Sequence, residues 1–215
     1  TVVSDVERQL LAEAAPGYTS VHVVPNSVDA GPAGEGVMGR QPDSLIFTGS
    51  LRYAPNHDAM TWFLSEIFPA VRADVPGVRL TITGDAGSQP PPSIPNVFMT
   101  GQIPDVRSLV AASAISVAPI RVGGGTRLKI LEAMALRTPV VATTKAIEGL
   151  EARNGEHLLI ADTPREFAGA VRRLLRDPAG ATQMADRAWH LQQSRYDSKV
   201  VVPKFLSLVD HATAA

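Results

Sequence analysis

The sequence predicts an α/β fold, a parallel sheet with helices on both faces, from three observations. From Ser44 onward, short apolar segments alternate with stretches of helical periodicity. The apolar segments lack the strict polar alternation of half-exposed strands, which is typical of strands covered on both faces of a parallel sheet. The 215 residues are 45% hydrophobic and 19% charged, values typical of a globular domain with one well-filled core.

The first 40 residues are predicted to form a helix, a short strand and a loop. Ser4 and Glu7 have the spacing at which each side chain can bond the other's backbone N–H at a helix start, so a helix is expected over residues 4–15. Residues 21–26 resemble a strand that a proline stops. The glycine-rich, weakly patterned residues 30–40 predict a linker or flexible loop.

The alternating region is predicted to contain six strands, three intervening helices and three closing helices. Short apolar runs, three of which end in glycine, predict strands at residues 45–49, 78–84, 97–101, 115–120, 139–143 and 157–161. Apolar residues spaced three and four apart predict helices at residues 56–73, 106–112, 127–136, 164–175, 179–193 and 199–211. The same spacing indicates a core built on Trp62, Phe63, Ile67, Phe68, Phe167, Val171, Leu174 and Leu175.

Charge and composition exclude several kinds of partner. The formal charge is −1 with both signs interspersed, so no basic field is available to hold a nucleic-acid backbone. The absence of cysteine excludes disulfides and thiolate nucleophiles. No apolar run approaches the roughly 20 residues that span a bilayer, and the N-terminus lacks a signal-peptide pattern. A cytoplasmic protein is expected, and a peripheral membrane contact of the full-length protein stays open.

The predicted sheet indicates where a ligand would bind. In parallel sheets ligands bind beyond the carboxyl ends of the strands, where loops converge and helix N-termini present N–H groups. The loops to inspect therefore follow Thr48, Thr83, Thr100 and Ile120. Asp85 and Asp105 lie in such loops without a second ligand at a recognisable spacing, so turn and helix-cap roles are expected for them rather than metal binding.

The glycine-rich segment after Ile120 is the strongest candidate for chemistry. Three consecutive glycines allow a backbone to approach an anion closely, and the helix that follows adds partial positive charge. Arg127 and Lys129 oppose that dipole, a conflict that a diphosphate would resolve, although both are also plausible as ordinary surface charges. Glu132, on a largely apolar helix, can accept hydrogen bonds from a ribose diol. The alternative is a solvated Glu132 paired with Lys129.

These residues carry a resemblance to a known family. The run Gly-Gly-Gly-Thr-Arg-Leu-Lys-Ile-Leu-Glu-Ala-Met-Ala at residues 123–135, followed by residues 139–143 and 148–150, resembles the donor-binding signature of retaining GT-B glycosyltransferases, the group-1 or GT4-like family. Residues 24–26, 47–50 and 101–105 resemble that family's entry into its C-terminal domain, its first strand and loop, and the segment beside the base.

The resemblance implies one Rossmann-like half of a GT-B fold. Such a half binds a UDP- or GDP-sugar, and the whole enzyme transfers a hexose with retention to a glycan, lipid or small-molecule acceptor, with no metal or other cofactor. Residues 1–25 are then the tail of an N-terminal domain or a linker, residues 26–195 the donor-binding domain, and residues 196–215 a helix that packs back on the N-terminal domain. That acceptor-binding domain is missing here, so the isolated half is expected to be inactive.

The resemblance also assigns single residues. Glu132 matches the second glutamate of the family's paired-glutamate motif, the one that holds the ribose hydroxyls. Gly124 stands where the first glutamate would be, so backbone N–H groups of the glycine segment are expected to contact the sugar instead. The expected donor-binding residues are Gly49, Ser50, Gly101, Gly123, Gly124, Gly125, Thr126 and Glu132.

A second departure from the family pattern concerns positive charge. Many relatives place an arginine and a lysine in the loop after the first strand to neutralise the diphosphate, and Ser50 and Asn56 stand at those positions here. We therefore expect Lys129 and Arg127 to supply this charge as catalytic residues, with Arg52 assisting.

Two other functions remain as alternatives, and a third is disfavoured. The chain could hold a nucleotide sugar without turning it over, or belong to a GT-B-fold epimerase acting on UDP-N-acetylglucosamine, which needs no acceptor. A dinucleotide-dependent dehydrogenase is disfavoured because no strand is followed by Gly-x-Gly-x-x-Gly with an acidic residue about 20 positions further on. The base, the sugar, the acceptor and the oligomeric state are not determined by the sequence.

Overall fold

The computed structural model describes the chain except for residues 19, 30, 32–38, 88–91, 125–127 and 214–215. Its centre is a sheet of six strands in the order β3-β2-β1-β4-β5-β6, and every neighbouring pair is parallel. The strands are β1 (Gln41–Thr48), β2 (Arg79–Thr83), β3 (Val97–Gly101), β4 (Ser113–Ala118), β5 (Val140–Ala142) and β6 (Leu159–Ile160). The predicted α/β fold with a parallel sheet is confirmed.

The strand order reverses between β1 and β4. From β1 the chain moves outward through β2 to β3, then returns to place β4 on the other side of β1 and continues to β5 and β6. The connections leaving β1 and β4 therefore diverge to opposite faces, which leaves a crevice between them at the carboxyl ends of the strands.

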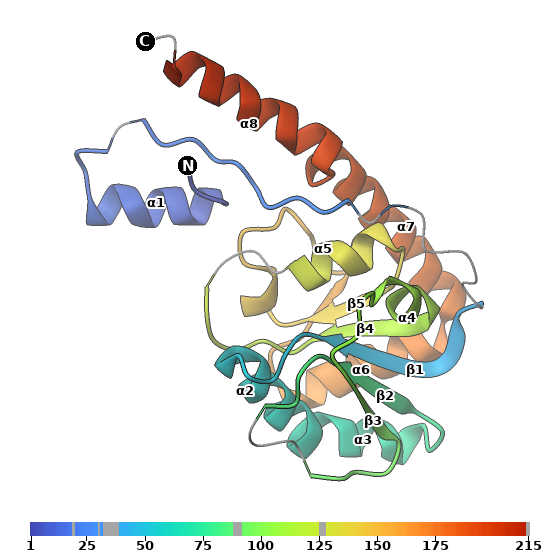
Figure 1. The fold of residues 1–215 in the computed structure, drawn as a ribbon. Coiled ribbons are helices and arrows are strands. Elements are labelled where there is room, and N and C mark those ends of the chain that lie inside the picture. The colour runs from blue at the N-terminus through green and yellow to red at the C-terminus, as the bar shows by residue number, and fades with distance from the viewer. Residues whose placement is uncertain (19, 30, 32–38, 88–91, 125–127, 214–215) are drawn as a thin grey trace.

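Helices cover both faces of the sheet (Figure 1). One face carries α2 (Ala54–Trp62), α3 (Phe68–Asp74) and α6 (Pro164–Arg176), and the other carries α4 (Arg107–Ala112) and α5 (Leu128–Ala135). Helix α7 (Pro178–Arg195) packs against both α5 and α6. A short 3-10 helix, η2 (Lys145–Ile147), follows β5.

The helix predicted at residues 56–73 is interrupted by a π-helical turn. This turn, η1 (Phe63–Ile67), separates α2 from α3, and the N–H of Phe68 bonds to the carbonyl of Phe63, five residues back. Pro69 follows directly, and because proline lacks an N–H it removes one regular helical bond at this point. The predicted aromatic core is present, since Trp62 and Phe63 both pack edge-on against the ring of Phe167.

Two sequence-based expectations are wrong in detail. Residues 21–26 do not form a strand, because only Val23 pairs, in a single parallel bridge with Val2. Strand β3 is not covered on both faces, since it lies at the sheet edge and exposes Phe98 and Met99. The apolar run indicated that both faces of this strand would be buried. An edge strand has fewer packed neighbours than a central strand, so its side chains can stay exposed.

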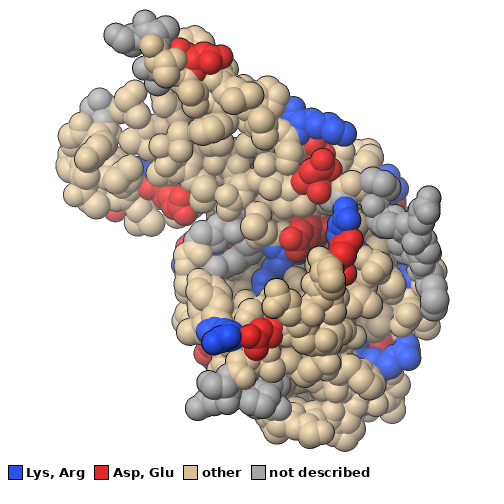
Figure 2. Space-filling view, viewed as in Figure 1, with Lys and Arg blue, Asp and Glu red and all other residues tan. Residues whose placement is uncertain are grey.

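The N-terminal segment and the last helix extend away from the sheet (Figure 1). Helix α1 (Asp5–Ala14) begins as predicted, with the Ser4 hydroxyl accepting the N–H of Glu7, while the Glu7 carboxylate accepts the N–H of Val3. None of the residues of α1 is buried. Helix α8 (Ser198–Thr213) lies beside this segment. In the space-filling view, a hollow lies between this extension and the body that holds the sheet, and charges of both signs lie around it (Figure 2).

Helix α8 presents an exposed apolar stripe. Residues spaced three and four apart share one side of the helix, and the stripe consists of Val202, Phe205, Leu206 and Val209. Leu208, on another side of the helix, is half-buried against residues 22–23. In the described part of the chain, no helix combines the length and apolarity that a membrane crossing needs.

Candidate functional site

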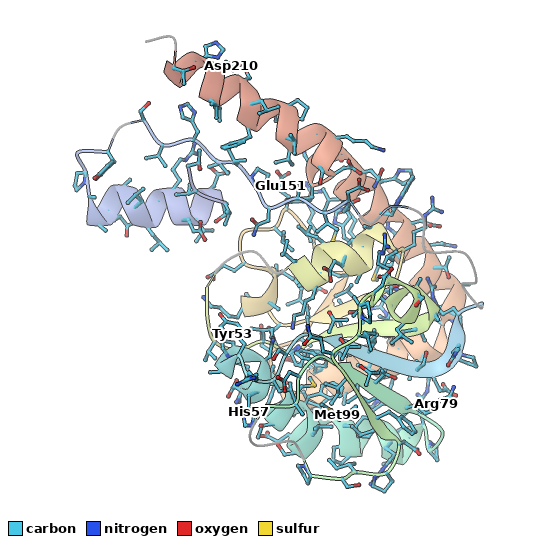
Figure 3. All side chains as sticks on the ribbon, viewed as in Figure 1. Tyr53, His57, Arg79, Met99, Glu151 and Asp210 are labelled. Carbon is cyan, nitrogen blue, oxygen red and sulfur yellow. The ribbon has the colours of Figure 1, made fainter. Side chains whose placement is uncertain are left out.

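A pocket of about 420 Å³ lies at the carboxyl ends of β1, β2 and β4, in the crevice where the strand order reverses. Figure 3 shows Tyr53 at this end of the sheet and Arg79, at the start of β2, at the opposite end. Residues from the loops after Thr48, Thr83 and Thr100 line the pocket, together with Ile120 and the start of α5. The lining residues are Thr48, Gly49, Tyr53, Asn56, Thr83, Gly84, Gln102, Ile103, Val106, Ile120, Leu128, Lys129 and Glu132.

The floor of the pocket is made of closely packed backbone. Gly49 has φ 133° and Gly84 has φ 100°, conformations that residues with a Cβ rarely adopt. A Cβ added to Gly84 would lie 2.7 Å from the carbonyl carbon of Gly49. The loops after β1 and β2 therefore touch through their main chains, and the space above them stays open.

Lys129 reaches across the pocket from α5 to α2. Its Nζ donates to Oδ1 of Asn56 at 2.9 Å and lies 3.8 Å from the ring centroid of Phe47. Asn56 is buried, and its Nδ2 donates to the carbonyl of Ser50 at 2.9 Å. These contacts fix the ammonium group near the loop after β1, where it can meet an anion that enters the pocket.

Glu132 lies one helical turn further along α5. Its side chain is half-buried, and burial raises the pKa of its carboxyl above the ordinary value, while the charge of nearby Lys129 lowers it in part. No hydrogen bond or ion pair joins this carboxylate to another of the described residues. The carboxylate is thus held in a partly desolvated position that favours a ligand with hydroxyl donors.

The structure brings together some of the predicted site residues and not others. Gly49, Lys129 and Glu132 line the same pocket. Ser50 and Gly101 are each next to a lining residue without lining the pocket, and Gly123 and Gly124 lie beyond Ile120 on the approach to α5. The remaining predicted residues, Gly125, Thr126 and Arg127, lie outside the described part of the chain.

Arg52 does not lie at this pocket. Its guanidinium bonds to the carboxylate of Asp85 at 3.2 Å, on the other side of the loop after β1, and the side chain is 74% exposed. The Asp85 carboxylate also accepts the N–H of Gly87, which lowers its pKa, and so has the turn role expected from the sequence. The Asp105 carboxylate accepts the guanidinium of Arg107 and also its backbone N–H, and these bonds lower the pKa of Asp105 to about 2.

Several lining residues were not named from the sequence. Tyr53, Gln102, Ile103 and Val106 come from the loops after β1 and β3, and Leu128 opens α5. Their loops were singled out, but ordinary apolar and polar residues in loops carry no pattern that marks the ones facing a ligand. Asn56 was noted as a departure from the family pattern, and its contact with Lys129 joins positions 73 residues apart.

Comparison with known proteins places this chain in a family. A model of the family described as glycosyl transferases group 1 matches residues 42–177, more than half of the chain. An uncharacterised 44.6 kDa protein of the cps region of Klebsiella pneumoniae is 27% identical over 169 residues, which are 74% of this chain and 44% of that protein.

Solved structures share the fold. TarM of S. aureus superimposes with a TM-score of 0.78 at 16% identity, over 96% of this chain and 42% of TarM. HepE of Anabaena, solved in complex with UDP-glucose, also gives a TM-score of 0.78, at 17% identity, over 98% of this chain and 63% of HepE. The chain thus spans about half the length of the proteins it matches. On the match over residues 42–177, the chain belongs to the group 1 glycosyltransferases.

Proposed function

We propose that this chain is the donor-binding domain of a retaining hexosyltransferase that uses a UDP- or GDP-sugar. One observation carries the proposal: Lys129 and Glu132, a cation and a partly desolvated carboxylate, line one pocket at the point where the strand order reverses. A nucleoside diphosphate has the matching groups, a diphosphate for the cation and a ribose diol for the carboxylate.

Each residue has a separate role in this proposal. Lys129 neutralises the diphosphate and stabilises the charge that develops as it leaves, with the N–H groups at the start of α5 contributing. Glu132 accepts hydrogen bonds from the ribose. Backbone N–H groups of Gly123 and Gly124 contact the donor sugar in place of the glutamate that many relatives have. Arg127 is proposed as a second cation on the diphosphate.

The solved relatives support UDP as the first nucleotide to test. HepE was solved with UDP-glucose, and the pneumococcal O-GlcNAc transferase GtfA with UDP and GlcNAc. At 16–17% identity these likenesses show the fold alone, so the base and the sugar are assigned to this chain only as part of the proposal.

In the same proposal, the two ends of the chain contact an acceptor-binding domain of a longer protein. Residues 1–25 are the tail of that domain, residues 26–195 bind the donor, and residues 196–215 pack back on the acceptor-binding domain through the apolar stripe of α8. The exposed side chains of α1 and α8 are consistent with a partner that covers them. The isolated chain binds donor and transfers nothing, because the acceptor site is elsewhere.

Calorimetry with UDP, GDP and ADP tests the proposal. The chain is expected to bind one nucleoside diphosphate saturably, and Lys129→Ala or Glu132→Ala to weaken that binding at least tenfold, about 1.4 kcal/mol. Leu109→Ala, on an exposed residue outside the pocket, is the control and should bind as the wild type does. Unchanged binding by both pocket variants would remove the proposed site.

The alternative functions predict different products in the longer protein. A transferase consumes the sugar nucleotide in proportion to the glycosylated acceptor. An epimerase converts UDP-N-acetylglucosamine without any acceptor, and a binding module leaves every sugar nucleotide unchanged. Product analysis with and without acceptor therefore distinguishes the three.

A further inference from the structure

Arg121 lies between β4 and the glycine segment, and its side chain makes two hydrogen bonds to Asp58 on helix α2. Its Nε donates to Oδ2 of Asp58 at 3.1 Å, and its Nη2 donates to Oδ1 at 2.6 Å. The two parallel bonds raise the pKa of Arg121. Such a paired geometry fixes the direction of the guanidinium as well as its distance.

The guanidinium of Arg121 also packs against an aromatic ring of the core. The guanidinium carbon of Arg121 lies 4.9 Å from the ring centroid of Trp62, one turn after Asp58 on α2. Trp62 is 4% exposed and packs edge-on against Phe167. A surface ion pair alone contributes little, but a guanidinium held by a bidentate carboxylate and a buried aromatic ring has few other orientations.

The residue before Arg121 is fixed as well. Ile120 is buried and lines the pocket, and its carbonyl accepts the hydroxyl of Thr143 from the end of β5. The chain is therefore held on both sides of the point where it leaves the sheet, directly before Val122, Gly123 and Gly124.

Helix α2 holds both Lys129 and Arg121 through side-chain contacts. Asn56 accepts the ammonium of Lys129, and Asp58, two residues later, accepts the guanidinium of Arg121. One rigid helix thus sets the position of the proposed phosphate-binding lysine relative to the start of the glycine segment.

We propose that Asp58 is a positioning residue of the donor site, which through Arg121 fixes the start of the glycine segment relative to Lys129. The inference rests on the proposed function, because the glycine segment leads into the start of α5, whose N–H groups that function assigns, with Lys129, to the diphosphate. UDP carries the second phosphate of that diphosphate and UMP lacks it. Asp58 touches no donor atom in this arrangement, and its effect passes through Arg121.

The test compares UDP with UMP in calorimetric titrations of the chain. Asp58→Asn keeps the size of the side chain and removes its charge, and is expected to weaken UDP binding about tenfold while changing UMP binding less than about twofold. Arg121→Lys is expected to act similarly, since an ammonium cannot make two parallel bonds. The double variant should bind UDP no more weakly than either single variant, because both substitutions break the same contact. Asp58→Glu should bind UDP more tightly than Asp58→Asn does.

A matched control separates positioning from stability. Asp74 and Arg172 form a comparable ion pair between α3 and α6, away from the pocket, so Asp74→Asn should leave both affinities unchanged. Equal weakening of UDP and UMP by Asp58→Asn, or wild-type affinity for UDP, would overturn the inference alone. A wild-type chain that binds neither UDP nor GDP would instead remove the proposed function, and the inference with it.

Discussion

At the scale of single residues, the pocket depends on two glycines whose backbones lie against each other. Gly84, directly after β2, has atoms of Gly49 and Ser50 within 2.9 Å of where a Cβ would be, and all of them belong to the main chain. Main-chain atoms cannot rotate away as the end of a side chain can. The two loops can approach this closely only because glycine occupies position 84.

Gly84→Ala is therefore expected to destabilise the fold by about 2–4 kcal/mol, from the clash and the positive φ together. Urea denaturation measures the loss. Gly77→Ala is the matched control, because nothing lies within 4 Å of its added Cβ, and it should stay within about 0.5 kcal/mol of the wild type. A stable Gly84→Ala would show that the main chains of the loops after β1 and β2 do not touch.

Glu132 is expected to oppose folding at neutral pH, because burial raises the pKa of its carboxyl in the folded chain. The unfolded chain then releases this proton more readily, so the stability contributed by the neutral form is present below the unfolded pKa and is lost as the pH rises through the folded pKa. Glu132→Gln should raise the melting temperature at pH 7.5 and give no gain at pH 3.5.

Thermal denaturation at the two pH values measures this difference. Glu151→Gln is the control, because Glu151 is exposed and its substitution should change the melting temperature little at either pH. An equal gain from Glu132→Gln at both pH values would show that the carboxyl is not desolvated in the folded chain.

At the scale of elements, three helices, α1, α6 and α7, begin where a side chain accepts one of their first N–H groups. Helix α6 starts with a complete capping box, in which the Thr163 hydroxyl accepts the N–H of Glu166 and the Glu166 carboxylate accepts the N–H of Thr163. The Asp177 carboxylate likewise accepts the N–H of Gly180 at the start of α7. These local bonds explain why the starts of α1, α6 and α7 agree with the predictions to within one residue.

Thr163→Ala is expected to cost about 1 kcal/mol of stability, because one N–H of α6 loses its acceptor. The same variant should bind nucleotide as the wild type does, since Thr163 does not line the pocket. Chemical denaturation with a parallel titration measures both. Ser65→Ala provides the comparison: that hydroxyl bonds to carbonyls of its own helix turn, so its loss should change stability by less than about 0.5 kcal/mol. Equal losses in the two variants would contradict the capping role.

At the scale of the whole molecule, the sheet with its helices forms one core, and residues 1–25 and α8 form an extension that buries little of its own surface (Figure 1). The stripe of α8 leaves Leu206 54% exposed. An apolar face of this kind on a helix that leaves the core favours a partner that covers it.

Leu206→Asp tests the proposal that the acceptor-binding domain of a longer protein covers this face. In the isolated chain the change should alter stability by less than about 0.5 kcal/mol, because the position is already in water. In the longer protein it should lower the melting temperature and the rate of sugar transfer, because a carboxylate would then be buried against the acceptor-binding domain. Unchanged behaviour in both proteins would show that α8 does not contact that domain.

The sequence by itself determined the fold class and nearly all the elements, because strand and helix periodicities and helix starts depend on residues close in the chain. Of the four loops that it indicated, those after Thr48, Thr83 and Thr100 contribute residues to the pocket. The same local reasoning was wrong for the edge strand β3, whose exposure depends on its neighbours in space, and for residues 21–26, where a single bridge replaces a strand.

Only the tertiary structure decided which side chains meet. Lys129 is held by Asn56, Arg121 by Asp58, and Arg52 turns to Asp85 away from the pocket, all through contacts between residues at least 33 positions apart. The sequence does not show which partner a charged side chain meets, because that partner lies in a loop that follows a distant strand. The family and the pocket's place in the fold could therefore be predicted from the sequence, whereas the arrangement of its charges could not.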